Sequence, residues 1–343
     1  MSEIELREDL GKSVILAEDD VVAEDGHLLG KEEPAKKIKH LVLAGGGTVG
    51  LVAFGALKAM DQQQGLWSKS DIESIDATSA GTILAIIIAL KYDWDEAETY
   101  IVKRPWHNVM KSDLYSILGA FEQRGIWNME IMEQVLFPLL LGKNLSKTVT
   151  LKEFFDVTKV DVHFYTSRMG NKCELVDISH LTHPTWTVVE AVYASSCVPI
   201  LFAPLFKDGV GYVDGGMLLN YPLGPCLQRP NVDPGATLGI DKIMESIEPP
   251  SEQSSSLFDF LMYLMIQLIQ SSWQRQYFSK IQQHGCGKKI QHEIYVASRI
   301  VTSMDLLRLS SSEEVRQKLI DEGVSMIASS SSSSSDLTKK TCL

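Results

Sequence analysis

Two strand–turn–helix patterns near the start of the sequence constrain the fold more than any other feature. An apolar run at 40–44 enters the glycine-rich turn 45–50, and a second run at 72–76 enters the small-residue turn 77–81. A helical pattern follows each turn. The first turn offers bare backbone N–H groups, and the second presents the hydroxyl of Ser79 on a sharp elbow. An oxyanion hole and a serine on such an elbow are the minimum equipment for acyl transfer.

The charge balance argues against one broad class of partner. The chain has 343 residues, of which 45% are hydrophobic and 22% charged, and its net charge is −12. This length can bury a large core, and the acidic balance argues against a general nucleic-acid binder. It also argues against docking on anionic lipid by charge alone.

Cysteine usage and the lack of long apolar runs bear on location. The five cysteines form no C-x-x-C pair and their number is odd, so neither a zinc site nor a disulfide framework is indicated. The N-terminus is acidic and lacks the basic-then-apolar order of a signal peptide, and no apolar run reaches about 18 residues. We therefore expect a cytoplasmic protein without a signal peptide or a transmembrane span.

The sequence divides into three parts. Residues 1–37 form an acidic arm, 38–325 the folded body, and 326–343 a flexible tail with an unbroken serine run. Strand-like and helix-like segments alternate within the body, which is typical of a sheet covered by helices on both faces. The expected strands are 38–44, 72–76, 162–168, 172–177 and 211–214, and the expected helices are 51–64, 82–92, 188–194 and 257–273.

Four motifs in this order resemble those of the patatin-like phospholipases. They are the glycine loop 45–50, the segment 77–81 where the family has G-x-S-x-G, the segment 194–204, and Asp214-Gly215-Gly216 followed by Asn220-Tyr221-Pro222. The resemblance covers roughly 38–225 and is weaker through about 325. It implies an α/β fold, a three-layer α/β/α sandwich with a mostly parallel central sheet, in which 38–325 is the catalytic domain.

The resemblance also implies a chemistry. Ser79 would be the nucleophile and Asp214 the base of a Ser-Asp dyad that works without histidine. The N–H groups of Gly45, Gly46 and Gly47 would hold the oxyanion near a helix N-terminus. The expected activity is that of a phospholipase A or lysophospholipase, which cleaves acyl esters through an acyl-enzyme. The scheme requires no metal and no other cofactor.

Five small residues are expected to support these groups. Ala77 stands where the family has the first glycine of the elbow, and alanine is the next smallest residue, so we expect the elbow to form. Gly81 keeps the second small position of the elbow, and Gly50 ends the glycine loop. Gly215 and Gly216 let the chain turn tightly, so that the carboxylate before them can face the elbow.

Three other functions remain open. The fold could be a catalytically weak lipid-binding or interaction module, for which Ala77 is the one hint in the sequence. The acyl group could be transferred to an alcohol instead of water. The spacing Gly45-x-Gly47-x-x-Gly50 also fits a dinucleotide-binding turn with Asp76 as the ribose-binding acid, but this hypothesis leaves the Ser79 elbow unexplained.

The expected partner is a phospholipid or another acyl lipid, with peripheral membrane contact open and no nucleic acid. Segment 257–273 is apolar around most of a helix and lacks a basic face. An interfacial helix usually has such a face, so we favour the core, or a cover over the acyl pocket, above membrane insertion.

Two shorter motifs have structural interpretations. His180 and His183 lie three residues apart, but Pro184 follows and no third ligand is evident, so we expect a loop and no metal site. Ser311 and Glu314 predict the capping box of a last helix that Gly323 would end.

Overall fold

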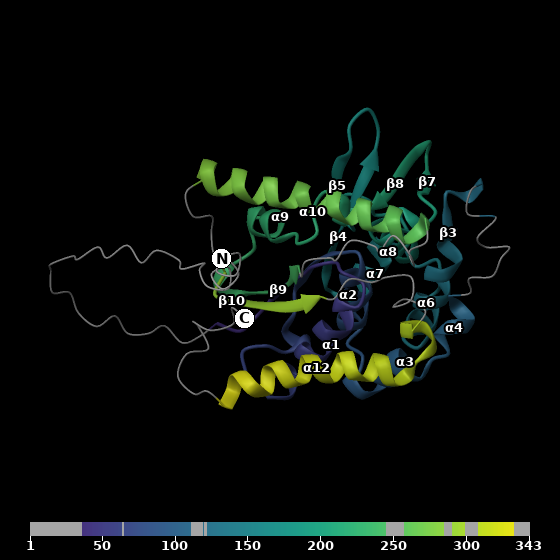
Figure 1. Ribbon diagram of the computed structural model, residues 1–343. Helices are drawn as coiled ribbons and strands as arrows, with labels where there is room; N and C mark the ends of the chain where they lie inside the picture. Colours follow the sequence, from purple (N-terminus) through teal and green to yellow (C-terminus); the bar gives the residue numbers. More distant parts are fainter. Residues whose placement is uncertain are drawn as a thin grey trace, which may run out of the picture. The chain divides into compact units, whose positions relative to one another are not determined.

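The computed structural model describes residues 36–63, 65–110, 119, 122–244, 257–284, 290–298 and 308–332. Figure 1 draws these segments in colour along the sequence. Most of the expected N-terminal arm, 1–37, and the end of the expected tail, 333–343, lie outside the described residues.

A mixed, mostly parallel sheet is the centre of the fold (Figure 1). Neighbouring strands are parallel throughout the run β10-β9-β1-β2-β4. Strands β5 and β8 pair with β4 in the antiparallel direction, and β7 lies beyond β8. The expected α/β class with a mostly parallel sheet is therefore confirmed. The bounds are β1 (His40–Leu43), β2 (Ser74–Thr78), β4 (Asp161–Met169), β5 (Glu174–Ser179), β7 (Leu205–Lys207), β8 (Val210–Asp214), β9 (Thr237–Met244) and β10 (His292–Ser298), with β3 (Gly125–Trp127) and β6 (Ile200–Phe202) in a separate two-stranded sheet.

Helices flank the sheet, and local capping explains where several of them begin. The Asp93 carboxylate accepts the first free N–H groups of α3, while Thr150 and Thr187 form capping boxes at the starts of α7 and α8. The bounds are α1 (Val49–Gln62), α2 (Ala80–Ala89), α3 (Trp94–Lys103), α4 (Trp106–Val109), α6 (Met129–Leu141), α7 (Leu151–Thr158), α8 (Val188–Ser196), α9 (Leu223–Gln228), α10 (Leu257–His284) and α12 (Glu313–Ser332).

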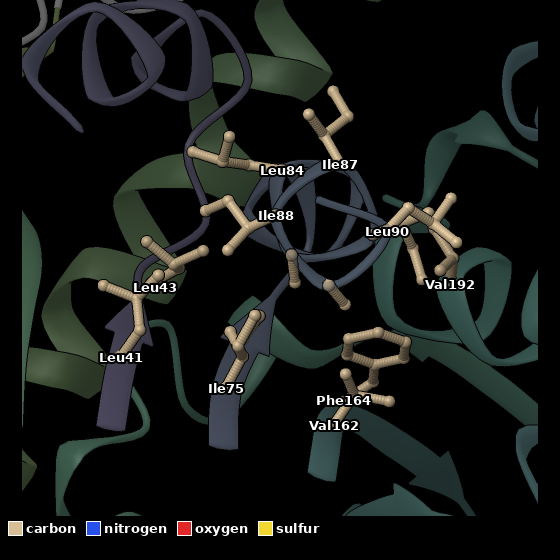
Figure 2. Close-up of a cluster of buried hydrophobic side chains, with 14 of the residues drawn as sticks. Leu41, Leu43, Ile75, Leu84, Ile87, Ile88, Leu90, Val162, Phe164 and Val192 are labelled. Atoms are coloured by element: carbon tan, nitrogen blue, oxygen red, sulfur yellow. The ribbon is translucent and has the colours of Figure 1, made fainter. Parts of the chain in front are cut away.

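The core lies where α2 packs on the middle of the sheet. Figure 2 shows Leu84 and Ile88 of this helix above Leu41, Leu43 and Ile75 of the neighbouring strands β1 and β2. All five side chains are buried. Full burial of such a side chain typically stabilises a fold by about 1.5–3 kcal/mol, so this contact fixes α2, and with it the turn before α2, firmly to the sheet.

Helix α12 corrects the expectation that Gly323 ends the last helix. It runs through Gly323 and continues past residue 325 to Ser332. Glycine is needed there for packing, because a Cβ on Gly323 would lie 2.0 Å from the Val52 carbonyl oxygen of α1. Figure 1 shows the two helices side by side. The first turn of α12 is capped by Ser312, whose Oγ accepts the Val315 N–H at 3.2 Å, one residue after the serine expected to cap it.

Candidate active site

Ser79 occupies a strained elbow between β2 and α2. Its backbone angles are φ 53° and ψ −128°, a region that costs a non-glycine residue on the order of 1–3 kcal/mol. The Ser79 N–H donates to Ser195 Oγ at 3.1 Å, and the Thr82 hydroxyl donates to the Ser79 carbonyl at 2.7 Å. Ala77, two residues earlier, is fully buried in β2. The elbow therefore forms with alanine in place of the first glycine, and Gly81 follows in the first turn of α2.

The glycine loop after β1 lies directly against this elbow. A Cβ on Gly45 would come within 2.8 Å of Ser79 Cβ, so only a residue without a side chain fits there. Gly46 and Gly47 have positive φ values of 152° and 58°, which glycine adopts without strain. Gly50 lies in the first turn of α1. The loop backbone thus passes beside the serine at the N-terminus of a helix.

Asn220 fixes the start of this loop. Its side-chain amide donates to the Gly45 carbonyl at 3.0 Å, and its own carbonyl accepts the Gly45 N–H at 3.1 Å. The Gly45 N–H is therefore already engaged. Among the described residues no backbone acceptor takes the N–H of Gly46 or Gly47.

Asp214 ends β8 and lies buried beside the elbow. Its Oδ1 accepts the Gly216 N–H at 2.6 Å, and Gly215 and Gly216 form the tight turn that follows it. Burial raises the pKa of the carboxyl from 3.8 to about 6, although the Ser79 hydroxyl, the Gly216 N–H and the Lys242 charge each lower it. The other carboxylate oxygen of Asp214, Oδ2, is buried and accepts no hydrogen bond from the described residues. Contacts of catalytic groups often become short only when substrate binds.

These groups line one cavity of about 360 Å³. Ser79, Asp214, Gly46 and Gly47 all contribute to its surface. The rest of the wall is mostly apolar: Trp127, Met132, Val198, Leu201, Phe202, Met262, Met265, Ile266 and Ile269. A second apolar cavity of about 240 Å³ shares Ile83, Met132 and Phe202 with the first. A mostly apolar lining with a few polar groups is typical of pockets that bind small molecules.

Lys242 was not anticipated from the sequence. It lies on β9 and lines the cavity, with its Cδ 3.1 Å from the position of a Cβ on Gly46. Burial lowers the pKa of its ammonium group to about 8, against the opposing influence of Asp214 and Asp241. A charged pair within an otherwise apolar strand segment, Asp241-Lys242, was the one signal that could have drawn attention to it.

Asp76 has a structural position that argues against the dinucleotide hypothesis. Its carboxylate is fully buried and accepts two hydrogen bonds, one from Arg229 Nη2 at 2.7 Å and one from the Tyr165 hydroxyl at 2.9 Å. A buried ion pair of this kind leaves no carboxylate oxygen directed to a ribose hydroxyl, and removing either partner is strongly destabilising.

The two histidines considered as metal ligands make aromatic contacts. His180 stacks on Phe155 with ring centroids 3.8 Å apart, and His183 packs edge-on against Trp186. In the ranges that the structure describes, no group of three or more His, Cys, Asp or Glu side chains could hold a metal ion. Across those same ranges, no helix is both long and apolar enough to span a bilayer.

Comparison with known proteins agrees with this architecture. Residues 41–227 match the profile of the family described as patatin-like phospholipase. Because the match covers more than half of the chain, the protein belongs to that family.

Two viral proteins are similar in sequence. Protein R571 of Acanthamoeba polyphaga mimivirus is 26% identical over 196 residues, covering 56% of this chain and 63% of R571. The probable lipid hydrolase 463L of Invertebrate iridescent virus 6 is 25% identical over 198 residues, covering 57% of this chain and 66% of 463L. The chain thus matches slightly less than two thirds of the length of each relative.

Solved structures with some likeness come from bacterial proteins. VipD from Legionella pneumophila superimposes with a TM-score of 0.46 at 16% identity, over 84% of this chain and 67% of VipD. ExoU of Pseudomonas aeruginosa, in its complex with SpcU, gives a TM-score of 0.37 at 13% identity, over 89% of this chain and 60% of ExoU.

Proposed function

We propose that the protein is a lipid acyl hydrolase of the phospholipase A or lysophospholipase type, with Ser79 as nucleophile and Asp214 as general base. One observation carries the proposal. A strained serine elbow, a buried carboxyl and a glycine loop line the same cavity, whose remaining walls are apolar. Family membership and the similarity to a probable lipid hydrolase support the same reaction class.

The proposed reaction begins when Asp214 accepts the proton of the Ser79 hydroxyl as its oxygen attacks an ester carbonyl. The tetrahedral intermediate collapses when Asp214 returns this proton to the leaving alcohol, which leaves the acyl group on Ser79. Asp214 then takes a proton from water, and the resulting hydroxide attacks the acyl-enzyme. The second tetrahedral intermediate collapses as Asp214 returns that proton to Ser79 Oγ, which releases the fatty acid and restores the Ser79 hydroxyl and the ionised Asp214. The pKa of about 6 suits this exchange, because the carboxyl is mostly ionised at neutral pH but still basic.

We assign the oxyanion role to the N–H groups of Gly46 and Gly47. The Gly45 N–H already donates to the Asn220 carbonyl, so Gly45 holds the loop against Ser79 and does not act as a donor itself. This assignment is narrower than the three-glycine expectation from the sequence. Loss of one oxyanion donor typically lowers the rate by about 10²–10³.

The apolar walls indicate where the acyl chain lies. The Ser79 cavity and the adjoining cavity together offer a surface of Ile, Leu, Met, Phe and Trp side chains. We propose that the acyl chain occupies this space, and that the alcohol side of the ester faces the polar part of the cavity near Asn220 and Lys242.

Fatty-acid release from a panel of phospholipids and neutral glycerides tests the proposal. Ser79→Ala should abolish release, while Ser70→Ala, which removes an exposed hydroxyl from the 3-10 turn before β2, should leave release unchanged. Circular dichroism would confirm that both variants fold. Lipid retained without any product, equally by the wild type and Ser79→Ala, would instead identify a non-catalytic lipid-binding module.

The same assay separates hydrolysis from acyl transfer. With a short alcohol added as acceptor, a hydrolase should still release mostly free fatty acid. An acyltransferase would give mainly the new ester, and this product would also disappear in Ser79→Ala.

A further inference from the structure

Helix α10 has two apolar faces with different surroundings. Met262, Met265, Ile266 and Ile269 on one face line the cavity that contains Ser79. Met262 is buried and packs in a small cluster that also includes Trp127. This face of the helix, which is labelled α10 in Figure 1, therefore forms part of the wall of the candidate active site.

The other face of α10 is exposed. Leu257 is 72% and Leu268 is 70% exposed, and Phe260, Leu261 and Leu264 are between 40% and 47% exposed. Positions 257, 261, 264 and 268 follow the spacing of a single stripe along a helix. Five of the eleven large apolar side chains that are exposed in the described residues lie within these twelve positions. Single exposed apolar side chains are common on protein surfaces, whereas a contiguous group of them is typical of an interaction surface.

The exposed stripe carries almost no charge. Between 257 and 271 the sequence contains one charged residue, Asp259, and neither lysine nor arginine. The whole chain has a net charge of −12. A surface of this composition is suited to an apolar, uncharged partner, since there is no cationic group along it to attract anionic lipid.

We propose that the outer face of α10 binds the surface of a lipid aggregate, a membrane or a micelle, by burying this uncharged stripe among the lipid chains. The proposal rests on the proposed lipid hydrolase function. The occupant follows from continuity: the helix that presents the stripe also forms the wall of the apolar cavity around Ser79. An acyl chain leaving the aggregate would then move along α10 into the cavity without crossing water.

The surface is tested with Ser79→Ala protein, so that the vesicles stay intact. In flotation with phosphatidylcholine vesicles, the added substitutions Leu264→Gln and Leu268→Gln should weaken binding at least about tenfold, because two apolar side chains are lost from the buried stripe. A matched control carries Leu141→Gln and Leu181→Gln, which are 57% and 69% exposed on other elements. This control should bind as the parent does.

Charge and salt distinguish this surface from an electrostatic one. Added phosphatidylglycerol and raised salt should change binding little, because attraction between charges is screened by salt while apolar burial is not. Binding that requires phosphatidylglycerol, or that high salt abolishes, would overturn the proposal. So would equal binding by the two double variants, or no binding of the parent to either vesicle.

Kinetics of the otherwise wild-type protein provide the second readout. The Leu264→Gln, Leu268→Gln variant should keep its rate on a soluble short-chain ester and show a raised KM on vesicles with little change in kcat. Equal loss on both substrates would contradict a surface role. A dimer that disappears in this variant by light scattering would identify a second copy of the chain as the occupant. If the wild-type protein hydrolyses no ester but still binds vesicles, the proposed function would be overturned and the lipid-binding surface would not.

Discussion

Asp214, the proposed general base, is a residue whose burial opposes the charge that its proposed role requires. Burial disfavours its charged form and raises its pKa to about 6, while the proposed mechanism needs that charged form. Three neighbours reduce the conflict: the Ser79 hydroxyl, the Gly216 N–H and the Lys242 ammonium all lower the pKa. The nearby Cys197 thiol stays neutral in the working range, because burial raises its pKa to about 12.

The pH profile should report this carboxyl. We expect kcat/KM on a soluble ester to fall as pH drops through about 6, because protonated Asp214 cannot accept the serine proton. Lys242→Met removes a positive charge that lowers the Asp214 pKa, so the acid limb should move to higher pH in this variant. An acid limb that stays in place in Lys242→Met would contradict the assignment of the limb to Asp214.

The stability of Asp214→Asn should reveal the same pKa shift without any catalysis. A folded-state pKa raised from 3.8 to about 6 favours the protonated carboxyl, so the wild type loses stability as pH rises through this window. The neutral asparagine escapes that loss. Above pH 6, we expect the free energy of unfolding of Asp214→Asn to exceed that of the wild type by on the order of 2–3 kcal/mol, so the variant is the more stable protein. Near pH 3 the two free energies should differ little. Chemical denaturation at both pH values measures this, and equal stability at pH 7 would contradict a buried, ionised carboxyl.

At the scale of elements, the contact between α1 and α12 depends on glycines. A Cβ on Gly323 would lie 2.0 Å from Val52 O, and one on Gly55 would lie 2.0 Å from Ile320 O. These backbones therefore approach more closely than any side chain permits. Arg316 anchors the start of the same helix by donating to the Val102 carbonyl of α3 at 2.6 Å.

This packing reverses the usual effect of replacing a helical glycine. Alanine in place of glycine normally stabilises a helix by about 1 kcal/mol. We expect Gly323→Ala to destabilise the protein by about 1–3 kcal/mol instead, because the helices must move apart. Gly65→Ala is the control, since no atom lies within 4 Å of a Cβ there, and it should change stability by less than about 0.5 kcal/mol. Denaturant unfolding compares the two, and a stabilised Gly323→Ala protein would contradict the close contact.

At the scale of the whole molecule, we propose that the catalytic domain continues to residue 332. Met326 and Ile327, beyond the boundary expected at 325, pack against the core from α12. A protein that ends at Ser325 should therefore be less stable than one that ends at Ser332, by about 2 kcal/mol. Thermal unfolding of the two truncated proteins measures the difference, and identical melting temperatures would place the boundary at 325 after all.

Local sequence patterns were sufficient to predict the centre of the fold. Apolar runs that end in turns of small residues predicted β1, β2 and the helices after them, and the strands expected at 162–168 and 172–177 correspond to β4 and β5. Strands β9 and β10 were not predicted, although they form the edge next to β1. Charged residues such as Lys242 and Glu293 interrupt their apolar pattern, and long-range pairing, which has no local signature, holds them in the sheet.

The candidate site was predictable to the extent that it follows from motifs. The positions of Ser79 and Asp214 depend on turns that small residues specify locally. Two contacts in the site have no local signal in the sequence. Asn220 accepts the Gly45 N–H from a position 175 residues further along the chain, and Lys242 approaches Gly46 from a still more distant strand. Gly323 also lacks a local signal of its role, because a glycine needed for packing against a distant helix cannot be distinguished in the sequence from a glycine that ends a helix.

Trapping the acyl-enzyme would show which residue attacks the ester. The protein would be incubated with excess p-nitrophenyl butyrate, quenched in acid, digested and analysed by mass spectrometry. We expect a butyryl group on the peptide that contains Ser79, none in Ser79→Ala, and much slower formation in Asp214→Asn. A butyryl group on another residue that forms at the rate of turnover, or undiminished turnover in Ser79→Ala, would contradict Ser79 as the nucleophile.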